Sequence, residues 1–141
     1  MKINIIKLIL IILIISFVSI GATSTIYFYS HRPELIAVNM DLTVEDSGIM
    51  GMNADNDSLH FGSIPRGGTS IRKMNLANNK NYPLLFNITI EGNFKEWVHV
   101  SNNNFILQPK ENKEMEFITK VPDDAPFNIY NGTVYITLRR Y

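Results

Sequence analysis

The side chains best suited to chemistry are few in this sequence, and they are not grouped. The chain has no cysteine, which excludes disulfides, thiolate metal sites and cysteine catalysis. Its histidines, His31, His60 and His99, lack the spacing of metal ligands, so we expect them on strand surfaces or at the rim of a domain. Neither a G-x-S-x-G elbow nor a G-x-x-x-x-G-K-[ST] loop is present. We therefore expect no catalytic activity and no cofactor.

One acidic segment has a pattern that could bind calcium. Asn53, Asp55 and Asp57 alternate along the chain, and alternating oxygens can turn toward one cation. The stricter calcium-loop pattern requires glycine at the sixth position and glutamate at the twelfth, where this chain has Ser58 and Ile64. A solvated turn whose Asx side chains bond to the local backbone explains the segment better. We expect the turn and keep a calcium site as the alternative.

Three N-x-[ST] sequons begin at Asn56, Asn87 and Asn131. They are candidate acceptors of N-linked glycans wherever this part of the chain is exported. Roughly two sequons would arise by chance in a chain so rich in asparagine. Their number is therefore no evidence of selection, although the pattern leaves Asn87 on the polar face of a strand, where a glycan would not disturb the core.

Aromatic and basic residues give two further candidates for binding. Trp97, together with Phe86, Phe105 and Phe117, could form a ligand platform, but inward aromatics of a β-sandwich fill the space between sheets, and we expect that role. Residues of a second group project from or follow the last predicted strand and form a candidate partner edge: Tyr135, Arg139, Arg140 and Tyr141. The alternative for this group is a polar edge capped by charge against aggregation.

The length and charge of the chain restrict the classes of protein. With 141 residues there is room for one domain. Thirteen Lys and Arg residues balance thirteen Asp and Glu residues, whereas a nucleic-acid-binding protein needs a surplus of basic residues to displace counterions. We expect no nucleic-acid partner.

The N-terminal region predicts a membrane anchor over residues 8–29. This stretch has no charged residue and is long enough to cross a bilayer as one helix. Its strongly apolar side chains together favour insertion by about 4 to 8 kcal/mol. Because Lys2 and Lys7 precede the stretch, the positive-inside rule leaves residues 1–7 in the cytoplasm and places the remainder outside, beyond a linker at 30–34.

A cleaved signal peptide is the alternative to an anchor. Lys2 and Lys7 form a basic n-region, and an apolar h-region of suitable length follows them. The only small-x-small cleavage site in the right place is Ser19-Ile-Gly21. Cleavage there would leave a partly apolar stub that starts at Ala22. We expect the uncleaved anchor.

Beyond Pro33 the apolar residues alternate with polar ones, which is typical of strands with one buried face. The clearest case places Leu84, Phe86, Ile88 and Ile90 on one face. Similar patterns and intervening turn residues predict strands at 35–44, 59–64, 69–76, 97–100, 105–107, 114–121 and 133–139. Short strands in this number fit an all-β fold over 35–141, an antiparallel two-sheet sandwich of immunoglobulin size.

Short motifs of this region occur in an order shared with a known family. They are LHFGSIPRG at 59–67, LANN at 76–79, PL at 83–84, LQP at 107–109, VP at 121–122 and GTVYI at 132–136. Together they resemble the immunoglobulin-like modules of the ASPM/SPD-2/Hydin and major-sperm-protein type. The resemblance spans residues 59–140 and implies an immunoglobulin-like sandwich. The arrangement of a short tail, one anchor and a single sandwich is also similar to small archaeal surface proteins.

The sequence as a whole predicts a single-pass membrane protein of the cell envelope with a non-catalytic β-domain outside. Its role would be adhesion, scaffolding or assembly through a protein or cell-envelope partner. The alternative function is a secreted or membrane-bound protein that binds calcium or a small ligand through the segment from Asn53 to Asp57.

Overall fold

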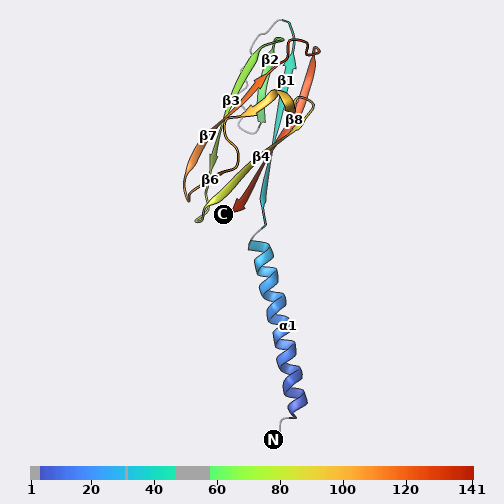
Figure 1. Ribbon diagram of the computed structural model, residues 1–141, viewed down its shortest axis with the longest axis vertical. Coiled ribbons are helices and arrows are strands. Elements are labelled where there is room, and N and C mark those ends of the chain that lie inside the picture. Colours follow the sequence, from blue (N-terminus) through green and yellow to red (C-terminus); the bar gives the residue numbers. More distant parts are fainter. Residues whose placement is uncertain (1–3, 31, 47–57) are drawn as a thin grey trace. The chain divides into compact units, whose positions relative to one another are not determined.

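The computed structural model describes residues 4–30, 32–46 and 58–141, and the chain divides into two compact units, Met1–Arg32 and Pro33–Tyr141 (Figure 1). The first unit contains the helix α1, Ile5–Ser30, which includes the predicted anchor at 8–29. It is the single helix in the described residues that is long and apolar enough to cross a membrane.

Apolar side chains surround α1 on every side, and none of its described residues is buried. A helix of this kind is stable when its surroundings are also apolar. Two of its threonines bond within the helix, because the Thr23 hydroxyl donates to the Ser19 carbonyl at 2.8 Å and the Thr25 hydroxyl donates to the Gly21 carbonyl at 2.8 Å. These bonds satisfy hydroxyls that would find no water in a bilayer.

The second unit is mostly β, and strands make up 51% of the structure. Sheet A has the strand order β2-β1-β8-β4-β6 and curls into a half-barrel, whereas sheet B has the order β3-β7-β5. The strands are β1 (Glu34–Val44), β2 (Ser58–Ile64), β3 (Thr69–Ala77), β4 (Leu84–Gly92), β5 (Val98–Val100), β6 (Phe105–Leu107), β7 (Asn112–Lys120) and β8 (Asn128–Arg140).

The alternating residues of the two sheets form one core. Leu84, Phe86 and Ile88 of β4 are buried, as the sequence pattern predicts. From sheet B, Met115 and Phe117 of β7 enter the same cluster. A slip of one residue in any of these strands would turn polar side chains inward, so the pattern fixes the face that each strand buries.

Two details of the predicted strands are wrong. An antiparallel arrangement holds for most pairs, but β1 and β2 are parallel. Residues 45–57 connect them, and a connection of about a dozen residues is what a parallel pair requires. In addition, Trp97 does not begin a strand, because it ends the short 3-10 helix η1, Lys95–Trp97.

The closing strand is not an edge of its sheet. β8 lies between β1 and β4 and pairs with both in antiparallel register. The prediction of a free strand edge is therefore wrong at Tyr135, which pairs with both neighbouring strands. Arg139 and Arg140 pair with β4 alone, because the register with β1 ends at Leu138, and Tyr141 follows the strand. β2 and β6 are the outer strands of sheet A.

The β unit has two ends, which we name the base and the far end. At the base the unit starts at Pro33 and finishes at Tyr141, whose N–H donates to the Pro83 carbonyl at 3.1 Å. We define the base as residues 33–35, 78–83, 108–113 and 139–141. The described loops at the opposite end of the strands form the far end, residues 45–46, 65–68, 93–97 and 121–127.

Candidate functional site

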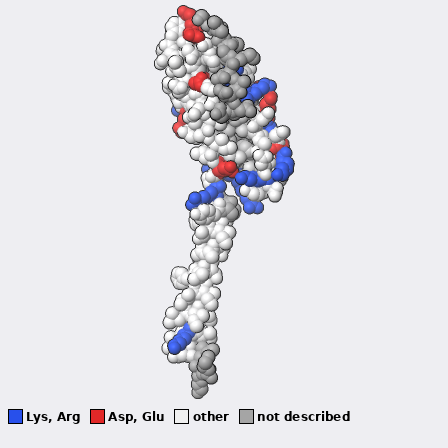
Figure 2. Space-filling model, turned by 180° about the vertical axis from the view of Figure 1, so that it is seen from behind, with Lys and Arg blue, Asp and Glu red and all other residues white. Residues whose placement is uncertain are grey.

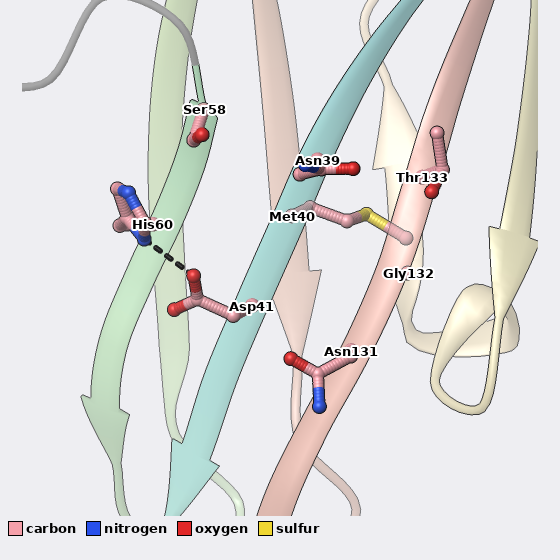
Figure 3. A pocket seen from close by; sticks show the side chains of 8 residues that line it. All are labelled: Asn39, Met40, Asp41, Ser58, His60, Asn131, Gly132 and Thr133. Atoms are coloured by element: carbon pink, nitrogen blue, oxygen red, sulfur yellow. Dashed lines mark hydrogen bonds and ion pairs between the residues drawn. The ribbon is translucent and has the colours of Figure 1, made fainter.

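A polar hollow lies on the outer face of sheet A, across β2, β1 and β8. Its volume is about 540 Å³. Its lining residues are Asn39, Met40, Asp41, Ser58, His60, Asn131, Gly132 and Thr133 (Figure 3). Most of these side chains are hydrogen-bond donors or acceptors, so the hollow is suited to a polar ligand.

Strand register brings the polar residues of the hollow together. Met40 and Leu42 of β1 are buried, which turns Asp41 between them to the outer face. Asp41 lies opposite His60 in the parallel pair with β2 and opposite Asn131 in the antiparallel pair with β8. The hollow therefore takes residues from three strands that share no local sequence motif.

His60 and Asp41 form the hydrogen-bonded pair at the centre of the site. The His60 Nδ1 atom is in hydrogen-bond contact with a carboxylate oxygen of Asp41, as Figure 3 shows. Both side chains are partly exposed, by 25% and 39%. When the ring is neutral and donates its Nδ1 proton to Asp41, its Nε2 atom is an acceptor for a ligand.

Side chains of β3 hold the β2 wall of the hollow in place. Arg72 donates from Nε to the carbonyl of His60 and from a terminal nitrogen to the carbonyl of Phe61, the latter at 3.3 Å. The Ser70 hydroxyl donates to the same Phe61 carbonyl at 3.2 Å. These bonds satisfy carbonyls on the open edge of β2 and limit the movement of His60.

The floor of the hollow requires a glycine. A Cβ atom at Gly132 would collide with the Met40 side chain and with the Glu91 carbonyl. Because β4 approaches β8 so closely here, a larger residue would displace backbone as well as the end of the Met40 side chain.

The chemistry available in the hollow is recognition by hydrogen bonds. Ser58, His60 and Asp41 are residue types of a catalytic triad, and the contact that the described structure shows among them is the one between His60 and Asp41. Within residues 4–30, 32–46 and 58–141, no group of three His, Asp or Glu side chains is placed to hold a metal ion.

Several predicted site residues lie outside the described part of the chain. These are the calcium candidates Asn53, Asp55 and Asp57, the sequon residue Asn56, and His31. The remaining histidine, His99, is exposed on β5, far along the chain from the Asp41–His60 pair.

The two described sequons share the outer face of sheet A. Asn87 of β4 is half-buried, and its amide donates to the Asn104 side-chain oxygen at 2.6 Å. Asn131 of β8 is exposed and lines the hollow. Neither side chain enters the core.

The aromatic residues pack as predicted. Phe86 and Phe117 are buried in the core, and Phe105 stacks on Phe86 with ring centroids 5.4 Å apart. Trp97 is half-buried against Tyr130, with centroids 4.7 Å apart. The side chains therefore fill the space between the sheets, as expected of inward aromatics.

Sequence reasoning missed the Asp41–His60 pair. The two residues are far apart in the chain, and only the parallel register of β1 and β2 joins them.

Comparisons of the chain with protein-family models, with curated proteins and with solved structures find no match. The function must therefore be inferred from the chain itself.

Proposed function

We propose that this protein is a non-catalytic binding or assembly module of the cell envelope, anchored in a membrane by α1 with its β unit outside the cytoplasm. The observation that supports this most directly is α1 itself, whose side chains are apolar and exposed on every side. Lys2 before the helix and Lys7 in its first turn favour a cytoplasmic N-terminus.

For the β unit we propose an immunoglobulin-like sandwich, similar to the ASPM/SPD-2/Hydin and major-sperm-protein modules. Two sheets around one core support this fold. The β unit differs from a simple antiparallel sandwich in two features. β1 pairs with β2 in parallel, and sheet A curls.

The binding role rests on the outer face of sheet A. Its hollow offers the Asp41–His60 pair and the amide side chains of Asn39 and Asn131 to a protein or cell-envelope partner. A preformed polar surface on a rigid sheet binds by complementarity and needs no chemical step.

The native sequons make a direct test of the topology. The full chain is translated in the presence of endoplasmic-reticulum microsomes, whose glycosylation machinery acts only on the lumenal side. We expect glycan addition at one or more of Asn56, Asn87 and Asn131, resistance of the product to alkaline extraction, and full polypeptide length after deglycosylation.

The matched control is the triple variant Ser58→Ala, Thr89→Ala, Thr133→Ala, which removes the sequons and must abolish the mass increase. A membrane-bound product without glycan at wild-type sequons would contradict the proposed orientation. A product that starts at Ala22 and is released by alkaline extraction would contradict the anchor and indicate a secreted protein.

A second candidate function is binding of calcium or a small ligand. The observation in its favour is that β2 begins at Ser58, in the wall of the hollow, directly after Asp57. If calcium binds there, it will raise the melting temperature of the full chain in detergent. The double variant Asp55→Ala, Asp57→Ala should lose this increase, and an increase that persists in the variant would exclude the loop.

A further inference from the structure

We infer that the base of the β unit is a binding surface for the anionic headgroups of phospholipids. This inference rests on the proposed function, because it requires α1 to hold the β unit beside a bilayer. It assigns the basic residues at the end of β8 to a lipid surface, where the sequence alone suggested a strand edge for a protein partner.

The charges of the β unit are separated between its ends. The base has five basic side chains, Lys80, Lys110, Lys113, Arg139 and Arg140, against two acidic ones, Glu34 and Glu111. These basic residues come from three separate segments of the chain, and only the fold gathers them at one end. The balanced net charge of the whole sequence therefore hides a local excess of positive charge.

The far end has the opposite balance. Its described residues include five acidic side chains, Glu45, Asp46, Glu96, Asp123 and Asp124, against two basic ones, Arg66 and Lys95. Figure 2 shows acidic side chains at the tip of the β unit and basic side chains toward its base. An anionic surface would thus attract the base and repel the far end.

The cations of the base remain available to a ligand. Of the five, only Lys80 has a carboxylate within 4 Å in the described structure, that of Glu34 at 3.1 Å. Arg140 stacks on the ring of Tyr82, 4.4 Å from its centroid. Stacking occupies the face of a guanidinium group and leaves its in-plane N–H donors for phosphate oxygens.

Apolar side chains accompany these charges. Leu35 is 60% exposed and Tyr141 is 75% exposed. Exposed aliphatic and aromatic groups beside Lys and Arg are typical of surfaces that lie at a lipid–water interface, where the apolar groups reach the acyl boundary and the cations reach the phosphates.

The chain length between the two units limits the distance of the base from the bilayer. α1 ends at Ser30 and β1 begins at Glu34, so the intervening backbone spans at most about 15 Å. If α1 crosses the membrane, the base must stay near the headgroups of the leaflet from which the helix emerges. The effective concentration of lipid at this surface is therefore high.

The absence of cysteine in the sequence allows a clean test. A single cysteine is introduced by Asn81→Cys, at an exposed position of the base, and labelled with a fluorophore. The full chain is reconstituted into nanodiscs that contain a headgroup quencher, made either from phosphatidylcholine alone or from equal parts of phosphatidylcholine and phosphatidylglycerol. We expect much stronger quenching with phosphatidylglycerol, and a loss of the difference at high salt.

The test variant is Arg139→Gln, Arg140→Gln. Each removed charge should lower the ratio of docked to undocked protein by about fivefold, and the pair by roughly 25-fold. The matched control is Lys95→Gln, Lys120→Gln, which removes the same charge from the opposite part of the unit and should leave quenching unchanged. The urea midpoint of each variant confirms that it is folded.

Equal quenching in both types of nanodisc, or unchanged quenching in the Arg139→Gln, Arg140→Gln variant, would overturn the inference. Failure of the proposed anchor gives a different result, because the chain would then not co-purify with nanodiscs of either composition. The two failures are therefore distinguishable.

Discussion

Asn78 is the buried polar residue that joins two loops of the base. It is fully buried, and its side-chain amide donates to the carbonyls of Tyr82 at 2.8 Å and Leu107 at 3.0 Å. Its side-chain oxygen accepts from the N–H of Lys80 at 2.9 Å. The Asn78 side chain thus satisfies three backbone groups. Two of them, the Lys80 N–H and the Tyr82 carbonyl, lie in the connection between β3 and β4, and the third is the Leu107 carbonyl at the end of β6.

Replacement of this side chain should be strongly destabilising. We predict that Asn78→Ala lowers the free energy of unfolding by about 2 to 4 kcal/mol, because two carbonyls and one N–H lose their partner near the core. The measurement is urea unfolding of the full chain in detergent, followed by the fluorescence of Trp97, the single tryptophan.

The neighbouring exposed residue gives the control for this prediction. Asn79→Ala removes an amide of the same type, and its effect should stay within about 0.5 kcal/mol. Equal midpoints for the Asn78→Ala and Asn79→Ala variants would show that the buried amide contributes nothing to the fold.

At the scale of the strand, a side chain protects the open edge of β4. β6 pairs only with Leu84–Phe86, and beyond it the side chain of Asn103 takes the place of a strand. Its oxygen accepts from the N–H of Ile88 at 2.7 Å, and its amide donates to the Ile88 carbonyl at 2.8 Å.

Hydrogen exchange at a single amide tests this role of Asn103. We predict that Asn103→Ala accelerates exchange of the Ile88 amide and lowers the free energy of unfolding by about 1 kcal/mol. Asn103→Asp keeps the acceptor and loses only the donor, so the Ile88 amide should stay protected in that variant. Rapid exchange in the wild-type chain would contradict the prediction.

Between β3 and β7, an ion-pair cluster makes stability depend on pH. Hydrogen bonds from Lys73 to Glu114, at 2.7 Å, and to Glu116 raise the pKa of Lys73 above its ordinary value. A raised pKa in the folded state means that the stabilisation is complete below the unfolded lysine pKa, about 10.4, and is lost as pH rises through the folded one.

We therefore predict that the difference in urea midpoint between wild type and Lys73→Gln is largest at neutral pH and shrinks above about pH 10.4. The pKa of Lys80 is also raised, by its hydrogen bond to Glu34, so the comparison with Lys73→Gln separates the effect of the Lys73 cluster from that of the Lys80–Glu34 pair. A difference that is independent of pH would show that the loss in the variant comes from packing instead of charge.

The strands were largely predictable because alternation is a local signal. The pattern from Leu84 to Ile90 gives both the strand and its buried face, and the structure confirms both. The pairing of β1 with β2 was not predictable, because it depends on how the chain returns over residues 45–57. The Asp41–His60 pair depends on that pairing, so the central feature of the hollow was beyond sequence reasoning.

At the scale of the whole molecule, the two units have different requirements. Every residue of the hydrophobic core lies between Val38 and Leu138, and α1 contributes none of them. The helix exposes apolar side chains on every side, whereas the β unit has a polar outer surface and its own core. In the function that we propose, the helix would anchor the protein and the β unit would offer the surface for a partner.

This division predicts that the β unit folds without the helix. A chain of residues 33–141 should be soluble without detergent and should unfold in one cooperative transition, with the same urea midpoint and slope as the β unit of the full chain. Its core needs nothing from residues before Pro33, and its N-terminal strand is held along its full length by β8.

A second truncation, at residue 39, removes the first half of β1 and serves as the matched control. It strips β8 of its partners from Glu34 to Val38 and should lower the midpoint sharply. An unfolded 33–141 chain would mean that the β unit depends on the anchor or on the bilayer beside it.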